Sequence, residues 1–360
     1  IEGIVNEPSE SGLRPVMEKF WTALEELGKD PESLAARSLV VERGQSLAEA
    51  FNHLDTQLCE LTNDLNSTLR VRVDEVNSLG RQIADLNQQI LKVEVTGARA
   101  NDLRDKRDLL VDKLAKTIDI RITEDEHSAL TITTSGRPLV QGEMASELVV
   151  DDMDQSYSEI YWADDPPENR LPLAVTGGII RGIIDARGYR DGDEVKGFIP
   201  AFSKQLDKLV QQFTGAFNAI HQDGYDLDGV QGVSFFINRE DSDNNDITAG
   251  SIAVNNVLIN DPCKDAAALP DEDGTFNTGD GSNALKLAQL KQSSVIDGFT
   301  PEDYYRALVG ELGVTAQEAY RMAENQELLV SQIENNRQAV SGVSLDEELV
   351  NVIRFQHAYS

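Results

Sequence analysis

The sequence predicts a mainly α-helical fold with β-rich insertions, in which long antiparallel helices form an elongated, coiled-coil-like bundle. Apolar residues recur at steps of 3, 4, 3, 4 and 3 from Val76 to Val93, which is the spacing of a helix with one narrow apolar seam. Seams of the same kind occur at 195–220 and 315–341. Stretches with the period-2 alternation of β-strands separate these helical segments.

The expected bundle is discontinuous in sequence. We expect its three parts at 1–117, 176–222 and 283–360, with a β-rich insertion at 118–175 and an acidic, β- and loop-rich excursion at 223–282. A chain of 360 residues with 40% apolar content can supply the cores of two or more domains. The sequence leaves open whether the two excursions form one outer domain or two.

In the N-terminal part, the sequence predicts a polar loop at 1–12 followed by two helices. The first has one apolar face and is expected to end at Gly28; its face comprises Met17, Phe20, Trp21, Leu24 and Leu27. Asp30 as N-cap and Pro31 in the first turn then predict the start of a second helix. Only Gly44 and Gly80 interrupt its pattern, and a helix over 46–95 would be roughly 75 Å long.

Gly97 is expected to stop this long helix, because a helix C-terminus favours a residue in the left-handed conformation. A returning helix is predicted from about Asn101, with Leu103, Leu110, Leu114 and Ile118 on its apolar side. A short turn between two helices makes them antiparallel neighbours.

The sequence of the first excursion predicts several short strands. Alternating residues favour strands at 118–122 and 130–134, with a turn at 136–138. Further strand candidates contain the pairs or triplets Leu148 and Val150, Ile160 and Trp162, and Leu171, Leu173 and Val175.

The two helical parts after the first excursion are each predicted to contain more than one helix. Gly177 and Gly178 precede a short helix, and after a turn at 187–193 a long one is predicted, with its seam running from Val195 through Phe217 to Ile220. Helix resumes near Asn283, and a final long helix over 315–341 has a seam of Met322, Gln326, Leu329, Ile333, Asn336 and Val340. A buried Gln and Asn there would fix the register of packing. Gly342 is expected to close it, and a capping box at 344–347 begins one more helix.

Composition narrows the classes of partner. A net charge of −31 disfavours binding to nucleic acid or to an anionic membrane surface, and no run of 18 apolar residues predicts a membrane span. Cys59 and Cys263 do not make a disulfide framework. The chain opens at Ile1 without an initiator Met or a basic segment, so we expect a fragment without a signal peptide.

No residue is predicted to be catalytic, to bind a cofactor or to ligate a metal. The acidic run 241–245 resembles the start of a calcium loop, but Asp246 and Ile252 occupy the positions that need Gly and Glu, so a solvated loop is favoured. Asp223, Asp226 and Asp228 are interpreted as turn residues.

The four histidines are spread along the chain, at His53, His127, His221 and His357, so metal-ligand spacing is absent. His221 follows an apolar helix end, where a cation interacts favourably with the helix dipole, and we prefer that role to catalysis.

Four blocks resemble the flagellar hook-associated protein 1 family, which acts at the hook–filament junction. The run NDLRDKRDLL at 101–110, preceded by IADLN at 83–87, is similar to one family motif. FWTAL at 20–24 with Asp30, Pro31 and Ala36-Arg37 is similar to a second. The stretch from Phe217 to Phe236, with FNAIH and GYDLDG, resembles a third, and SGVSLDEE at 341–348 a fourth, with Ser344 in place of the usual Asn. The blocks occur in the expected order over nearly all of the chain, although the two excursions show no clear match.

The resemblance implies a structural, non-enzymatic protein of the bacterial flagellum that forms a ring between hook and filament. It implies contacts with hook protein, with another hook-associated junction protein and with copies of itself, export through the flagellar type III apparatus, and a cytoplasmic chaperone on the C-terminal helix. It also implies that this chain lacks the family's terminal segments. Two alternatives remain: another axial protein, such as the second junction protein or a filament subunit, and an enzyme carried on a flagellar scaffold. The apolar seams likewise have two interpretations, intramolecular core or leftover faces that pack against other copies.

Overall fold

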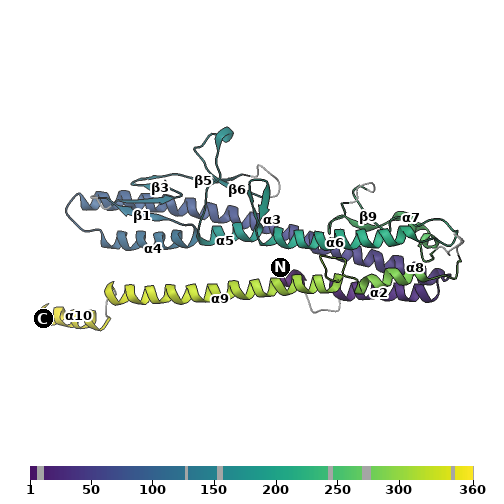
Figure 1. The fold of residues 1–360 in the computed structure, drawn as a ribbon. Helices are drawn as coiled ribbons and strands as arrows, with labels where there is room; N and C mark the ends of the chain where they lie inside the picture. The colour runs from purple at the N-terminus through teal and green to yellow at the C-terminus, as the bar shows by residue number, and fades with distance from the viewer. Residues whose placement is uncertain are drawn as a thin grey trace. The chain divides into compact units, whose positions relative to one another are not determined.

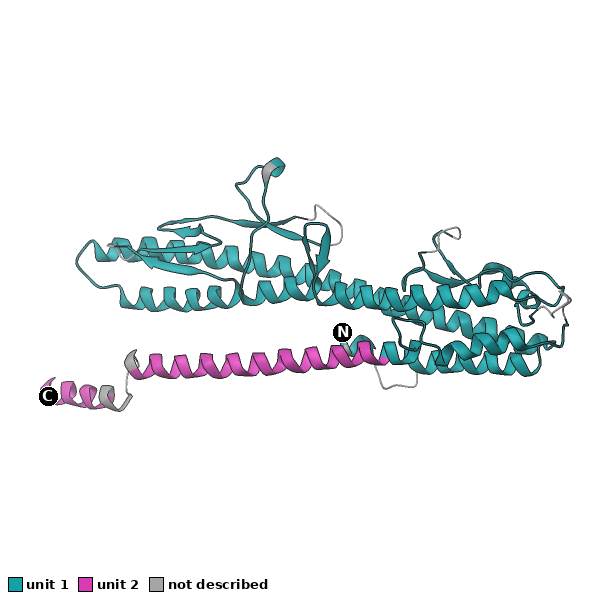
Figure 2. Ribbon diagram, in the orientation of Figure 1, with its two compact units in different colours: residues 1, 3–305 teal, residues 2, 306–360 magenta. Residues whose placement is uncertain are grey.

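The computed structural model describes residues 1–5, 12–125, 129–151, 157–241, 246–269, 277–341 and 345–359. They form two compact units, one of Gly3–Tyr305 with Ile1 and one of Arg306–Ser360 with Glu2 (Figure 2). No helix in these ranges is both long enough and apolar enough to cross a membrane. The short helix α1 spans Glu2–Val5.

Two helices begin the first unit, and the second is continuous through Gly44 and Gly80. Helix α2 spans Leu13–Lys29 and buries the predicted face, with Gly28 inside its last turn. Helix α3 spans Leu34–Glu94, and its 61 residues extend for about 90 Å at 1.5 Å per residue. The predicted start at Asp30 and Pro31 is wrong, because these residues form a turn and Ser33 is the N-cap, its hydroxyl accepting a hydrogen bond from the Ala36 amide.

Helices α3 and α4 form the predicted antiparallel hairpin (Figure 1). Gly97 lies in the turn with φ of +85°, as its position predicts. Helix α4 spans Asn101–Thr117 and buries Leu114. A two-pronged ion pair from the Arg104 guanidinium to Glu94, with nitrogen–oxygen distances of 2.7 Å, fastens the start of α4 to the end of α3.

The first excursion contains a four-stranded antiparallel sheet in the order β1-β2-β3-β4 and a separate pair, β5-β6. The strands are β1 (Arg121–Glu124), β2 (Leu130–Thr134), β3 (Arg137–Gln141), β4 (Met144–Ala145), β5 (Leu148–Asp151) and β6 (Glu159–Trp162). The predicted turn at 136–138 is misplaced by one residue, because Ser135 and Gly136 take φ of 49° and 79° and the strand resumes at Arg137. The predicted strand around Leu173 is absent among the described elements; this stretch is irregular apart from the 3-10 turn η1 (Pro167–Asn169).

The first excursion shares one hydrophobic core with the helices. Side chains of the sheets pack with those of α3, α4 and α5 in a single cluster that includes Ile83, Leu114, Ile132, Leu148 and Ile180. The irregular stretch joins it through buried Leu173 and Val175.

A short helix, a hairpin and a long helix follow. Helix α5 spans Gly178–Arg187 and α6 spans Phe198–Asp223. Between them, β7 (Tyr189–Asp191) and β8 (Glu194–Lys196) form an antiparallel hairpin where only a turn was predicted. Val195 therefore belongs to a strand and not to the helical seam, whereas the seam residues from Ile199 to Phe217 are buried as predicted.

The second excursion covers the other half of α3. It contains the hairpin β9 (Phe236–Asn238) and β10 (Ile252–Val254), helix α7 (Asn256–Asn260) and the turn η2 (Pro262–Lys264). An aromatic core joins α2, α6 and β9 here, with neighbouring ring centroids 4.9–5.9 Å apart; it comprises Phe20, Trp21, Phe213, Phe217, Phe235 and Phe236. Helix α8 (Ser282–Gln289) and η3 (Leu290–Gln292) follow. In the described residues, no strand of one excursion pairs with a strand of the other.

The second unit consists of helices. Helix α9 spans Pro301–Ser341, so it begins earlier than the predicted residue 315, and α10 spans Leu345–Tyr359. Every side chain from 317 to 339 is exposed. The predicted burial of Gln326 and Asn336 is therefore wrong for this chain alone, because the seam on which they lie is uncovered. Gly342 and the Ser344 cap lie outside the described residues.

Candidate functional site

The described residues contain no grouping of three or more His, Cys, Asp or Glu side chains that could hold a metal ion. His53 and His357 are exposed on α3 and α10, far apart in the sequence, and His127 lies outside the described residues. Of the acidic run compared with a calcium loop, only Asp241 is described; its amide donates to the Asn238 side chain, as in a turn.

His221 is fully buried near the end of α6, where it organises a loop. Its Nδ1 faces the carbonyl oxygen of Val233, so Nδ1 carries the donated proton. Its Nε2 lies 3.1 Å from the Ala266 amide and 3.0 Å from Oδ1 of Asp265. The expected role at the helix dipole is therefore incomplete, because the ring joins three chain segments that are distant in sequence.

Arg37 completes this buried polar cluster. Its guanidinium donates to the carbonyl oxygens of Pro31 (2.7 Å), Cys263 (3.4 Å) and Asp265, and it is 1% exposed. Burial lowers the pKa of Arg37, and the nearby Asp265 carboxylate opposes that shift. Backbone groups bond to Arg37 and His221, whereas the Asp265 carboxylate has Oδ1 against His221 and Oδ2 without a hydrogen-bond partner in the described residues. The cluster ties the α2–α3 turn to the second excursion, and its groups are buried from solvent.

The predicted turn-making role is confirmed for Asp226 and Asp228, whereas Asp223 is the last residue of helix α6. Oδ1 of Asp226 accepts hydrogen bonds from the amides of Asp228 (2.9 Å) and Val230 (2.8 Å). Lys264 forms ion pairs with both Asp226 and Asp228. The GYDLDG block is thus a structural loop held by its own carboxylate.

Asparagine side chains fasten both excursions to the helices, a role that the sequence analysis missed. Asn77 of α3 donates to the Leu148 carbonyl and accepts from the Leu148 amide, each at 2.8 Å, so its amide group replaces a neighbouring strand. Asn218 of α6 does the same to Phe236, at 2.7 and 2.9 Å. Asn87 bonds to both backbone groups of Leu130 and accepts from Arg107. An Asn on the apolar side of a predicted helix was the available signal.

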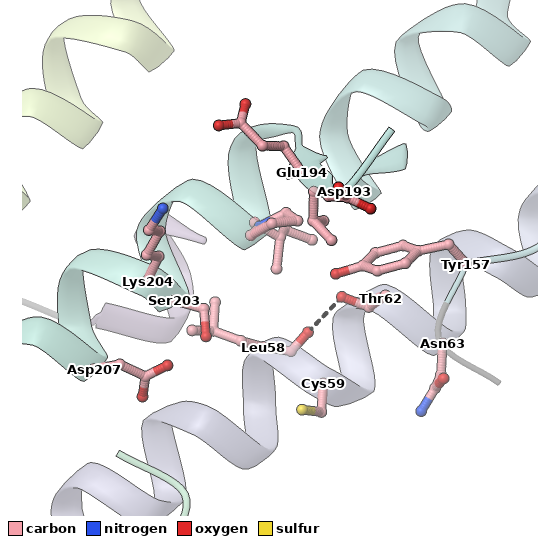
Figure 3. Close-up of a pocket in the computed structure, with 13 residues that line it drawn as sticks. Leu58, Cys59, Thr62, Asn63, Tyr157, Asp193, Glu194, Ser203, Lys204 and Asp207 are labelled. Atoms are coloured by element: carbon pink, nitrogen blue, oxygen red, sulfur yellow. Dashed lines mark hydrogen bonds between the residues drawn. The ribbon is translucent and has the colours of Figure 1, made fainter. Parts of the chain in front are cut away.

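A cavity of about 640 Å³ lies between α3, α6 and the β7–β8 hairpin (Figure 3). Cys59 lines it from α3, and Lys204 and Asp207 line it from α6. Burial raises the pKa of Asp207, against a hydrogen bond from the Ala249 amide, and burial with the Asp207 charge raises the pKa of Asp55. Burial and both carboxylates also raise the pKa of Cys59, so it is held as a thiol and is a poor nucleophile.

The free apolar surface of the second unit is the candidate functional site. On α9, Met322, Leu329 and Ile333 of the predicted seam are 57%, 52% and 66% exposed. On α10, Val352 and Phe355 are 50% and 76% exposed. Contiguous exposed apolar residues on long helices are typical of surfaces that pack against another protein. The chemistry available here is helix packing, since acid–base or nucleophilic groups do not converge on it within the described residues.

Comparisons with known proteins find similarities to flagellar proteins in both sequence and fold. The model of the flagellar hook-associated protein FlgK helical domain matches residues 1–236. Flagellar hook-associated protein 1 of Bacillus subtilis (strain 168) is 35% identical over 389 residues, covering 100% of this chain and 75% of that protein. The same protein of Escherichia coli (strain K12) is 27% identical over 98% of this chain and 78% of its own length. In fold, the chain is similar to the flagellar hook junction protein FlgK from Burkholderia pseudomallei, with a TM-score of 0.79, 17% identity and coverage of 94% and 96%.

Proposed function

The chain belongs to the FlgK family of flagellar hook-associated proteins, and we propose that it works as a structural subunit of the bacterial flagellum at the junction between hook and filament, where filament assembly needs it. Family members are structural flagellar proteins. The single observation that carries the proposal for this chain is the uncovered apolar seam of α9, which offers a packing surface in place of a reactive site.

The same proposal names the partners in finer detail. The subunit would contact hook protein on one side and a second hook-associated protein on the other, with copies of itself completing a ring. It would leave the cell through the flagellar export apparatus, with a cytoplasmic chaperone holding the C-terminal helix until export. The exposed face of α10 supports this last step, because an amphipathic helix with free apolar residues needs a cover in the cytoplasm.

The proposal includes the absence of enzymatic activity. Backbone atoms bond to the buried side chains of Arg37 and His221, Asp265 is buried against His221, and the Cys59 thiol is kept protonated. We also propose the domain division stated above, with a helical bundle at 1–117, 176–222 and 283–360 that carries excursions at 118–175 and 223–282. The asparagine contacts of α3 and α6 support this division, because side chains of these helices form hydrogen bonds with backbone groups of both excursions.

Electron microscopy of cells that lack the gene encoding this chain tests the junction role. We expect hooks without filaments, with filament subunits released into the medium. Normal filaments on the mutant cells would contradict the proposal and would favour a paralogue or another axial position.

A paired substitution on α9 tests the packing surface. Leu329→Asp with Ile333→Asp should abolish filament assembly while leaving the helical circular dichroism unchanged, since both side chains are exposed. Ser331→Asp, on the opposite face of the same turn, is the matched control and should support assembly. Loss of helicity in the double variant would mean that the seam is core.

A further inference from the structure

Helix α9 contains two glycines less than one turn apart, Gly310 and Gly313, inside the regular helix that spans Pro301–Ser341. Glycine is the poorest helix former after proline, because its backbone loses the most conformational freedom on becoming helical and because it has no side chain to cover the helical hydrogen bonds. A glycine in a helix interior is therefore expected to serve packing, an unusual backbone conformation, or easy opening of the helix.

Neither packing nor backbone conformation accounts for these two glycines within the described residues. Neither has a positive φ, and a Cβ atom added at either would have no packing neighbour within 4 Å. Gly44 of α3 shows the opposite case, since a Cβ atom there would lie 2.7 Å from the Phe235 ring. Gly44 thus makes room for the aromatic core, whereas easy opening is the property that remains for Gly310 and Gly313.

The neighbours of the two glycines weaken the helix further. Val309, Val314 and Thr315 are β-branched and lose side-chain freedom in a helix, so five of the seven residues from 309 to 315 are poor helix formers. The following stretch, 316–341, has no Gly or Pro and consists mostly of Ala, Gln, Glu, Leu and Arg. Helix propensity along α9 therefore has a local minimum at 309–315.

This minimum lies between a fixed end and an uncovered arm. The first turn of α9 belongs to the first unit, where Tyr305 is 2% exposed and Glu302 accepts a hydrogen bond of 2.6 Å from Arg14 of α2. The side chains of 309–315 are all partly or fully exposed, and every side chain from 317 to 339 is exposed. Helical turns with little tertiary packing open most easily, so opening at 309–315 breaks few contacts besides its own hydrogen bonds.

We propose that residues 309–315 are a flexible joint in α9. At the joint the helical hydrogen bonds open and re-form, so the arm 316–341 takes several directions from the fixed first turn. The arm itself stays helical, and its free apolar seam can turn toward the surface that covers it without any change in the first unit. The joint is a property of the isolated chain, whereas its use in assembly rests on the proposed junction function.

Distances between spin labels test the joint in the isolated chain. One pair of labels, at Ala307→Cys and Gln326→Cys, spans the joint, and the control pair, at Ala319→Cys and Gln338→Cys, spans the arm alone. All four positions are exposed, and the members of each pair are 19 residues apart, which is about 28 Å in a straight helix. The two native cysteines are replaced by serine, and unlabelled chain is added in excess so that only distances within one chain are measured.

The width of the distance distribution decides the outcome. We expect the distribution across the joint to be at least twice as wide as that of the control pair and to extend to shorter distances. Equal widths would overturn the proposal, because α9 would then be either rigid or frayed throughout.

Replacing the glycines tests their part in the joint. Gly310→Ala with Gly313→Ala should narrow the distribution across the joint to the width of the control pair, since Ala is the best helix former. The matched control, Gly182→Ala with Gly215→Ala, replaces two exposed glycines of α5 and α6 at which a Cβ atom would likewise meet nothing within 4 Å, and it should leave the width unchanged. An unchanged width in the α9 variant, or equal narrowing in both variants, would overturn the assignment of the joint to these glycines.

Filament assembly in cells that lack the native gene tests how the joint is used. Complementation should decrease in the order Gly, Ser, Ala at positions 310 and 313, because Ser is a weaker helix former than Ala. If the glycines instead make room for a partner helix, the larger Ser would be worse than Ala. That order, or full assembly with the Ala variant, would overturn the use of the joint in assembly. Normal filaments without any complementing gene would refute the junction function and leave the distance measurement unaffected.

Discussion

Helices α3 and α9 carry apolar seams with the same period but have opposite surroundings. Most of the seam of α3 between Val40 and Ile90 is buried, because α2, α4, α5, α6 and the strands pack around it. The seam of α9 is exposed throughout 317–339. The comparison teaches that a 3-4 period identifies a face that needs a cover but does not identify the molecule that supplies it.

Identical substitutions in the two seams should give the largest contrast. Leu69→Ala on α3 removes a side chain that is 0% exposed and should lower the free energy of unfolding by about 2–5 kcal/mol. Leu329→Ala on α9, at 52% exposure, should change it by less than ~0.5 kcal/mol. Urea titrations followed by circular dichroism compare them. Equal losses would mean that α9 is already covered in the isolated chain.

The asparagine contacts should give the next largest effect, and here the comparison is between a buried and an exposed position of α3 itself. Asn87→Ala leaves the buried backbone groups of Leu130 and the Arg107 side chain without their partner, so it should cost about 1–3 kcal/mol. The exposed Asn63→Ala on the same helix is the control. Thermal melts compare the stabilities of the two variants. An Asn87→Ala variant as stable as Asn63→Ala would show that water replaces the hydrogen bonds of the Asn87 side chain.

The start of α3 should be more sensitive at Ser33 than at the Asp30 position that the sequence favoured. Ser33→Ala removes the cap on the Ala36 amide and should lower stability by about 1 kcal/mol. Asp30→Ala should have little effect, because its described hydrogen bonds use backbone atoms. Thr300, whose hydroxyl accepts from the Asp303 amide at 3.1 Å, plays the same part at the start of α9. A lower melting temperature for the Asp30→Ala variant than for the Ser33→Ala variant would instead support the helix start that the sequence predicted.

The smallest effect is expected at the cavity between α3 and α6, as a pH dependence. Because the folded-state pKa of Asp207 is raised, the native chain holds this proton more tightly than the unfolded chain does. Its contribution is therefore favourable at low pH and is lost as the pH rises through the folded-state pKa. Asp207→Asn should remove this loss, giving a gain at pH 7 below ~1 kcal/mol that disappears near pH 4. Urea titrations across that range measure it; a gain independent of pH would contradict the mechanism.

Sequence patterns predicted the helices better than the connections between them. The seam of α6, the hairpin of α3 and α4 and the strand β2 follow from period and from Gly97, since local sterics and burial act on neighbouring residues. The β7–β8 hairpin was missed because its three-residue strands are exposed and carry little alternation. The stretch around Leu173 alternates like a strand but is irregular: Leu173 and Val175 are buried without ladder pairing, and Leu171 is exposed.

For the candidate site, too, the sequence predicted some features and missed others. The sequence located the α9 seam and the four family blocks, but it assigned Gln326 and Asn336 to a buried interface. It gave no account of why Asn87 and Asn218 stand within those blocks, and it assigned His221 only to the helix dipole; the structure shows that each bonds to backbone groups of an excursion. Such contacts join residues that are far apart in sequence, so an Asn on the apolar side of a helix signals a buried partner but does not identify that partner.

By itself, the sequence determined which segments become long helices, where the chain changes period, and, through its four blocks, the family. These depend on local periodicity, caps and motif order. Only the tertiary structure decided which seam is core and which is free, and that His221 and Asp226 organise a loop. The physical reason is that burial is a property of two surfaces: the chain encodes one face by its period, and packing chooses the other.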